Sequence, residues 1–201
     1  LGGTPPDCSI MREHLGRVWT DDKTDKDLVH YSSTGDPEEW LGVGDSGALP
    51  IAPGDGDPTG VSAIFPPFKG RLFVAKGAKT YQVSGFAPEE YLVEPFTTGL
   101  GCESHKAVVA VDMDDVLFIS KKGIHSLGAT ASHGDFTGGF LSKKIQPTFN
   151  TWPKSKLNKS HALYLPDLNA VAFSVAEEDQ TSPTSIYLRS EERFSRNAET
   201  V

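Results

Sequence analysis

The sequence predicts an all-β protein made of β-propeller-like blades, in which short strands form antiparallel meanders. Glycine and proline together account for 34 of the 201 residues and are spread along the whole chain, which is typical of many short strands joined by tight turns. Short runs of alternating apolar and polar residues recur between these turns. A pattern of strand, turn and strand is found about four times, so we expect about four blade units.

Two copies of this repeat are closely similar. The first is GRLFVAKGAKTYQVSG, beginning at Gly70, and the second is DDVLFISKKGIHSLGA, beginning at Asp114. Leu72 and Leu117 are 45 residues apart, within the range of four-stranded propeller blades. We therefore expect equivalent strands in which either the two phenylalanines or the aliphatic residues beside them face the core. The residues concerned are Leu72, Phe73, Val74, Leu117, Phe118 and Ile119.

Two weaker copies flank this pair. Upstream, residues 16–20 (GRVWT) precede a partner strand at 28–33; downstream, residues 169–175 (NAVAFSV) precede another at 185–188. The aromatic markers of the four copies are 54, 45 and 55 residues apart: Trp19, Phe73, Phe118 and Phe173. Unequal spacing favours blades with variable loops over a strict solenoid.

Tight turns are expected at residues 76–79, 121–123 and 166–169, with glycine supplying a positive φ in the first two. A further strand at residues 106–112 would complete a meander with the strands around Phe118 and at GIHSLG.

Helix is expected at one place only, near residues 141–149. Leu141, Ile145 and Phe149 are four residues apart and would share one helical face. Pro147 interrupts this pattern, so we expect the helix to end near Gln146. The PEEYLVE segment at residues 88–94 could add one more turn.

Composition excludes some classes of function. The chain has 19 basic and 27 acidic residues and a net charge of −8, which disfavours a global electrostatic grip on DNA or an anionic membrane. No apolar run is long enough to span a membrane. Cys8 and Cys102 could pair, but two cysteines do not define a disulfide scaffold, and we expect two thiols.

Three motifs suggest chemistry and are each explained by a turn. GDSG around Ser46 resembles a protease nucleophile loop, but too little chain precedes it for that fold. Asp55 and Asp57 are spaced as in calcium loops without the later ligands, so a bound cation stays an open alternative to a turn. The segment from Ser33 to Trp40 resembles the Asp-box turn of sialidase-like propellers with Gly35 and Asp36 in the wrong order, and we expect Trp40 to pack between blades.

The six histidines form no metal-binding pattern, and no phosphate-binding glycine loop is present. The sequence therefore predicts neither an enzyme nor a cofactor.

The sharpest charge feature is a segment with five lysines and no acidic residue. It could meet phosphate groups or an acidic neighbouring subunit, and a solvated surface is the alternative. We expect these lysines to face a partner subunit or the path of DNA: Lys143, Lys144, Lys154, Lys156 and Lys159.

The order of several segments resembles the propeller region of tailed-phage virion proteins, namely head–tail connector, hub and tail-nozzle proteins of the packaged-DNA stabilisation type. The resemblance covers about residues 17–149 and departs after about Pro153. It rests on HYSSTGDPEEW, IAPGDGDPTGVSAIFPPFKGRLFVAKGAKTYQVSG, TTGLGCESHKAVVAVDMDDVLFISKKGIHSLGA and LSKKIQPTF.

The resemblance implies a structural protein without catalytic residues, located in the phage tail or neck after assembly in the host cytoplasm. Its implied partners are other tail or connector subunits, further copies in a ring, and genomic DNA in transient contact during ejection. An acidic channel would let DNA slide, since it gains nothing from counterion release. The rival hypothesis is a carbohydrate-binding or glycosidase-like propeller that recognises a host receptor.

We further expect residues 1–201 to form one propeller-like domain that is a fragment of a longer chain. At about 40–50 residues a blade, the length supplies about four blades. The segment ERFSRN near the end is expected to start another strand.

Overall fold

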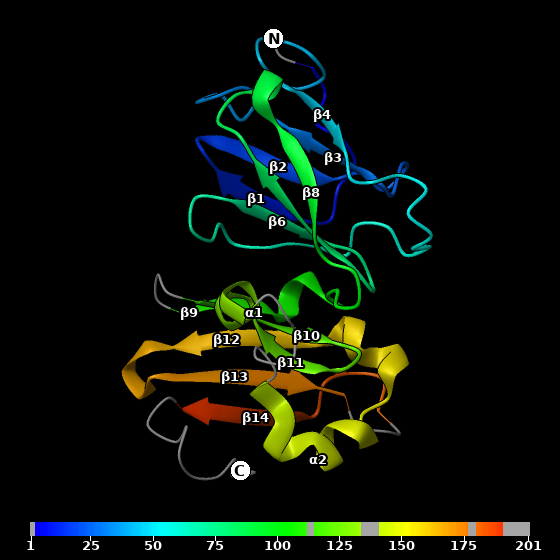
Figure 1. The fold of residues 1–201 in the computed structure, drawn as a ribbon, viewed down its shortest axis with the longest axis vertical. Coiled ribbons are helices and arrows are strands. Elements are labelled where there is room, and N and C mark those ends of the chain that lie inside the picture. Colours follow the sequence, from blue (N-terminus) through cyan, green and yellow to red (C-terminus); the bar gives the residue numbers. More distant parts are fainter. Residues whose placement is uncertain (1–2, 112–114, 134–140, 177–179, 191–201) are drawn as a thin grey trace. The chain divides into compact units, whose positions relative to one another are not determined.

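The computed structural model describes residues 3–111, 115–133, 141–176 and 180–190. Its strands form four small antiparallel sheets, and within each sheet the strands follow their order in the sequence (Figure 1). The chain divides into two compact units, Leu1–Gly101 (unit 1) and Cys102–Val201 (unit 2), with two sheets in each. A mostly β fold of antiparallel meanders is thus confirmed, and no closed propeller is formed by the described residues.

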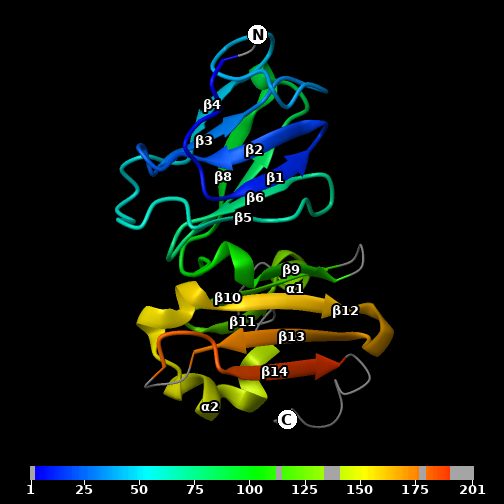
Figure 2. The ribbon, with the colours of Figure 1, turned by 180° about the vertical axis from the view of Figure 1, so that it is seen from behind.

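Unit 1 contains two four-stranded sheets (Figures 1 and 2). Sheet 1 consists of β1 (Met11–His14), β2 (Arg17–Asp21), β3 (Leu28–Tyr31) and β4 (Gly47–Pro50). Sheet 2 consists of β5 (Ala63–Ile64), β6 (Leu72–Ala75), β7 (Thr80–Ser84) and β8 (Leu92–Thr97), with a 3₁₀ turn η1 (Pro88–Glu90) before β8. Both sheets contribute to one core, which includes Trp19, Val29, Leu72, Val74 and Tyr81.

Unit 2 contains two three-stranded sheets and most of the helical turns. Sheet 3 consists of β9 (Val108–Val111), β10 (Asp115–Ser120) and β11 (Gly123–Ser126), and sheet 4 of β12 (His161–Leu165), β13 (Ala170–Val175) and β14 (Ser185–Ser190). The helices are η2 (His105–Ala107), α1 (Leu127–His133), η3 (Leu141–Ile145), α2 (Gln146–Thr151), η4 (Lys154–Lys159) and η5 (Pro166–Leu168). Both sheets again share one core.

The two closely similar repeats occupy equivalent strands, as predicted. β6 and β10 are each the second strand of a meander, and Phe73 pairs with Gln82 as Phe118 pairs with His125. The aliphatic neighbours of both phenylalanines face the unit cores, the second of the two alternatives. The phenylalanines lie on the opposite faces of their sheets and are also buried. Phe73, for example, packs against the ring of Phe96, with ring centroids 5.0 Å apart.

The two weaker repeats also place their aromatic markers in second strands, with a shift in register. Trp19 in β2 and Phe173 in β13 face the unit cores, whereas Phe73 and Phe118 face away from them. Successive residues of a strand point to opposite faces, so a displacement of one residue produces this difference. The markers therefore identify the strands but do not share one structural position.

The predicted helix is present, but its expected end is wrong. Residues 141–151 form η3 and then α2, and Pro147 lies in the first turn of α2. Proline is tolerated there because the first amide groups of a helix have no partner within it. Helix α1 was not predicted. No helix of the described residues is long and apolar enough to cross a membrane.

The predicted turns are all found, though one glycine has another role. Gly123 has a φ of 155°, as the hairpin between β10 and β11 requires. Gly77 has no positive φ; instead a Cβ there would lie 2.7 Å from Oγ1 of Thr59. In the third turn, Asn169 adopts the left-handed conformation at φ 43°. ERFSRN lies outside the described residues.

Candidate functional site

The predicted lysine segment forms three consecutive helices of unit 2, namely η3, α2 and η4. Helix α2 lies beside β14 (Figure 1), and Trp152 packs against Tyr187 in a tilted arrangement with ring centroids 4.8 Å apart. Phe149, Trp152 and Leu157 are buried in the core of this unit. The segment is therefore amphipathic, with its apolar residues inside and its lysines half-buried or exposed.

Two of the predicted lysines are engaged within their own unit. Nζ of Lys154 donates a 2.7 Å hydrogen bond to the carbonyl of Phe149 and lies 3.6 Å from the centroid of that ring. Burial lowers the pKa of Lys154. Nζ of Lys159 donates a 2.7 Å hydrogen bond to the carbonyl of Thr181. Lys156 is half-buried. These three are therefore less suited to meet a partner than the remaining two.

Lys143 and Lys144 are exposed and form no hydrogen bond or ion pair with other described residues. Their helix η3 is attached to the hairpin of β10 and β11, because the amide of Ile124 donates a 3.0 Å hydrogen bond to Oγ of Ser142. Nε2 of Gln146 also donates to the carbonyl of Lys122 at 3.2 Å. These contacts bring a second pair of exposed lysines to the same part of unit 2.

We call the four exposed lysines of η3 and the β10–β11 turn the lysine patch: Lys121, Lys122, Lys143 and Lys144. Nζ of Lys121 lies 3.7 Å from Oε1 of the largely buried Glu103. The sequence prediction missed Lys121 and Lys122 because they lie about 20 residues from the segment, and only the tertiary hydrogen bonds bring them near it.

A different lysine is completely buried in unit 1. Lys76, in the turn between β6 and β7, has no exposed side-chain surface. Its Nζ lies 2.7 Å from Oδ1 of Asp27, 3.4 Å from Oδ1 of Asp55 and 3.2 Å from the carbonyl of Ala52. A buried ammonium group is tolerated when it is paired and hydrogen-bonded in this way. Lys76 thus joins the hairpin turn to two loops of the same unit.

The carboxylate of Asp55 is shared by Lys76 and two further side chains. Tyr81 donates a hydrogen bond to its carboxylate, and Lys79 lies 3.5 Å from Oδ2. Burial raises the pKa of Asp55, but the hydrogen bonds from Tyr81 and the Asp57 amide and the charge of Lys76 outweigh it, lowering the pKa to about 2. This carboxylate is therefore charged at neutral pH.

The calcium alternative for Asp55 and Asp57 gains no support from this geometry. Ammonium groups of the protein already occupy the surroundings of Asp55. Asp57 accepts hydrogen bonds from the amides of Thr59 at 3.0 Å and Ala78 at 2.8 Å. Among the described residues, no group of three or more His, Cys, Asp or Glu side chains is arranged to hold a metal ion.

The other motifs form the turns expected of them. Oγ of Ser46 is buried, donates a 2.6 Å hydrogen bond to the carbonyl of Val43 and accepts one from the amide of Gly42. Trp40 is 3% exposed, and its indole donates to the carbonyl of Pro37 at 2.8 Å. Cys8 and Cys102 are both thiols, and burial raises the pKa of Cys102 to about 12.

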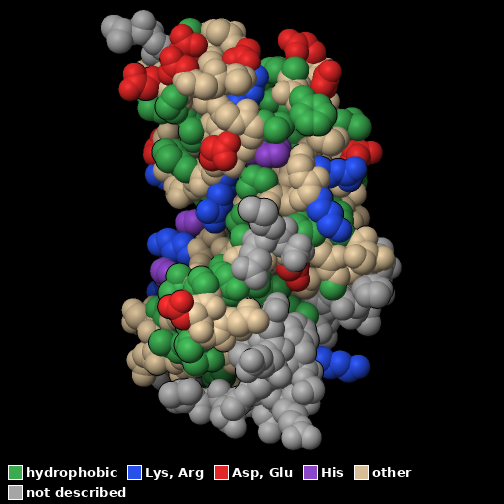
Figure 3. All heavy atoms as spheres, turned by 90° about the vertical axis from the view of Figure 1, so that its left-hand side faces the viewer, with side chains coloured by type: hydrophobic (Ala, Val, Ile, Leu, Met, Phe, Trp, Pro, Cys, Tyr) green, Lys and Arg blue, Asp and Glu red, His purple; other side chains and the backbone are tan. Residues whose placement is uncertain are grey.

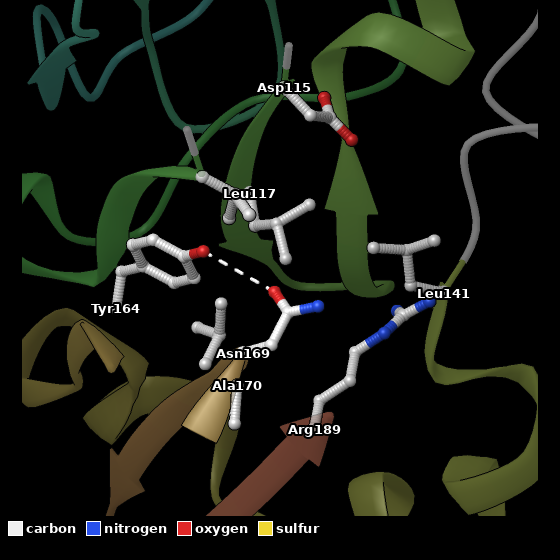
Figure 4. Close-up of a pocket in the computed structure, with 9 residues that line it drawn as sticks. Asp115, Leu117, Leu141, Tyr164, Asn169, Ala170 and Arg189 are labelled. Atoms are coloured by element: carbon white, nitrogen blue, oxygen red, sulfur yellow. Dashed lines mark hydrogen bonds between the residues drawn. The ribbon is translucent and has the colours of Figure 1, made fainter. Parts of the chain in front are cut away.

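A small cavity of about 40 Å³ lies in unit 2 (Figure 4). The Tyr164 hydroxyl points across it and donates a 3.3 Å hydrogen bond to Oδ1 of Asn169, and Arg189 extends into it from β14. At its edge Asp115 already accepts hydrogen bonds from Ser126 and Gly128 at 2.5 and 2.8 Å. Ligand pockets have volumes of about 300–1,000 Å³, so this cavity suits water rather than a substrate.

Tryptophan is not available as a sugar-stacking surface. The chain has three tryptophans, and Trp19, Trp40 and Trp152 are 1%, 3% and 2% exposed. Sugar sites commonly combine an exposed aromatic ring with converging polar groups. The positions of these rings therefore weigh against the carbohydrate hypothesis.

No family model matches the chain, and no curated protein matches it.

Proposed function

We propose that the chain is a structural protein of a tailed-phage virion and forms part of the head–tail connector or of the tail tube or nozzle. In this role, several copies of the chain form a ring around the path of the genome, and each copy contacts neighbouring subunits. The sequence resemblance supports this role, and so does the repetition of one meander pattern in four sheets. Such sheets are the units from which propeller blades are built.

The outer face of sheet 4 is the observation that carries the proposal. Leu163, Ala172 and Leu188 are direct cross-strand neighbours on this face, beside Ile186. Leu163 is 60% exposed and Ile186 is 56% exposed. Contiguous exposed apolar surface marks a site of protein contact, whereas the small cavity and buried tryptophans offer little to a small ligand.

The test is to locate the chain in native particles. Purified virions are labelled with an antibody against the chain and imaged by negative stain, and the chain is quantified by mass spectrometry. We expect label at the tail vertex and several copies in each particle. Absence from virions, together with specific binding of the soluble chain to host glycans, would overturn the proposal in favour of the carbohydrate hypothesis.

A further inference from the structure

Charge is divided unequally between the two units. Unit 1 has 15 acidic and 8 basic residues, a net charge of −7, while unit 2 has 12 acidic and 11 basic residues, a net charge of −1. The division is sharpest in two segments of the sequence. Residues 28–68 include six acidic residues and no lysine or arginine, and residues 136–166 include five lysines and no acidic residue. On the face drawn in Figure 3, most acidic side chains belong to unit 1.

The acidic segment presents a preformed loop between β3 and β4, which we call the acidic loop (residues 33–46). Arg17, itself 2% exposed, forms an ion pair with Asp45 and donates to the carbonyl of that residue at 2.8 Å. The Thr34 amide donates to Asp45 at 2.9 Å, and the Glu38 amide donates to Asp36 at 2.9 Å. These contacts hold the loop in place while leaving Asp36 and Glu38 exposed.

The acidic surface continues beyond this loop. The amide of Gly35 donates a 2.8 Å hydrogen bond to the carbonyl of Gly16 in the turn between β1 and β2. The amide of Gly16 in turn donates to the exposed Glu13 at 3.0 Å. Glu13 therefore adds its charge beside the acidic loop.

We propose that the lysine patch of one copy binds the acidic loop of a second copy. The inference rests on the proposed ring-forming role and names the two surfaces that meet. Four exposed ammonium groups face exposed carboxylates, and complementary charges of this kind orient two partners and accelerate their encounter. The contact joins different surfaces of the two copies, so each copy keeps one surface for its next neighbour. Such head-to-tail contacts close into a ring or extend as a filament.

An acidic protein surface fits the patch better than DNA does. Tight binding to a phosphate backbone typically involves about 6–10 neutralised phosphates, and the patch has four lysines and no arginine. Arginine is the residue that recognises phosphate through two parallel hydrogen bonds.

The experiment measures self-association of the full chain by analytical ultracentrifugation at low and high salt. The variant is Lys143→Glu with Lys144→Glu. The matched control is Lys69→Glu with Lys106→Glu, which changes the net charge equally at two exposed lysines outside the patch. We expect the variant to weaken association about tenfold or more, equivalent to about 1.4 kcal/mol, and the control to stay near wild type.

A charge exchange identifies the partner surface. Asp36→Lys with Glu38→Lys is expected to weaken association when alone, and mixing it with the lysine-patch variant is expected to restore association. Wild-type chain that stays monomeric at every concentration, or a mixture that fails to associate, overturns the inference. Loss of binding to a short DNA duplex in the lysine variant, with self-association unchanged, overturns it in favour of nucleic acid.

This outcome is independent of the virion test. A chain found at the tail vertex that does not associate through these surfaces leaves the proposed function standing and removes the inference. A chain that associates through these surfaces but is absent from virions leaves the inference standing and removes the proposed function.

Discussion

The hairpin of β6 and β7 and the hairpin of β10 and β11 begin with nearly the same residues and use their first lysine in opposite ways. Ala75 pairs with Thr80 across a four-residue turn, whereas Ser120 pairs with Gly123 across a two-residue turn. Lys76 in the longer turn is completely buried between Asp27 and Asp55, and Lys121 in the shorter turn is 57% exposed. Turn length, rather than the strand pattern, decides where the lysine lies.

This difference separates the roles of the two units. In unit 1 the hairpin lysine is an internal anchor that joins three segments. In unit 2 the equivalent lysine contributes to an outer charged surface. The same repeat therefore supplies stability in one place and a contact surface in the other, and the following predictions test that contrast.

The largest expected effect is at the two lysines themselves. Lys76→Met removes a buried ammonium from two carboxylates and is expected to lower the free energy of unfolding by about 3–5 kcal/mol. Lys121→Met removes an exposed charge and is expected to change it by less than about 0.5 kcal/mol. Urea denaturation followed by fluorescence measures both. Equal effects at the two positions would contradict the contrast between anchor and surface.

Substituting the equivalent core leucine of each hairpin is expected to cause a similar loss of stability, but the loss should affect a different unit in each case. Leu72→Ala and Leu117→Ala each empty part of a core and should each lower stability by about 2–5 kcal/mol. Hydrogen exchange read by mass spectrometry should show faster exchange in β2, β6 and β7 for the first variant. For the second, the faster exchange should be in β10, β11 and β13. Faster exchange in all sheets for either variant would show that the units do not respond separately.

Acid is expected to act on His125 of unit 2 and on Asp55 of unit 1 in different pH ranges. Burial, together with Lys122, lowers the pKa of His125 in unit 2 from 6.5 to about 4. The unfolded chain takes up this proton below pH 6.5 and the folded chain only below about 4, so unit 2 should lose about 3 kcal/mol over that range. Asp55 has a folded pKa of about 2 against 3.8, so its contribution to unit 1 is lost only as the pH falls from about 4 to 2.

The measurement is hydrogen exchange in each unit between about pH 7 and 2, corrected for intrinsic rates. His125→Gln is the control for unit 2 and should flatten the loss between pH 6.5 and 4. A loss that persists in this variant would assign the acid sensitivity to another group.

The smallest expected effects are at the glycines of the two turns. Gly77→Ala places a methyl group 2.7 Å from Oγ1 of Thr59, and Gly123→Ala forces a side chain into a φ of 155°. Each should lower stability by about 1–3 kcal/mol. Thr59→Ala should rescue part of the first loss by removing the clash and should not rescue the second. Thermal melts of the single and double variants measure this coupling.

The strands were largely predictable because their signal is local. Alternation and turn residues placed the second strand of every meander, and the 45-residue spacing matched equivalent positions in β6 and β10. The burial of Lys76 was not predictable in this way. It depends on Asp27 and Asp55, which other parts of the chain bring to the turn, and an isolated lysine is ordinarily exposed.

The candidate surface was only partly predictable for the same reason. Absence of acidic residues around Lys143 and Lys144 marked the segment, but the contribution of Lys121 and Lys122 depends on the hydrogen bonds of Ser142 and Gln146. The helix was misjudged at Pro147 because a proline within an apolar pattern can either end one helix or begin the next.

The consecutive order of strands in all four sheets has a consequence for folding during synthesis. Every sheet pairs neighbours along the chain, so each can form from residues that have already emerged from the ribosome, without waiting for a distant strand. Local pairing carries a small loop-closure entropy and favours rapid folding. Sheets 1 and 2 can therefore fold before sheets 3 and 4 are translated, which keeps apolar strands of the first unit from meeting those of the second while both are unfolded.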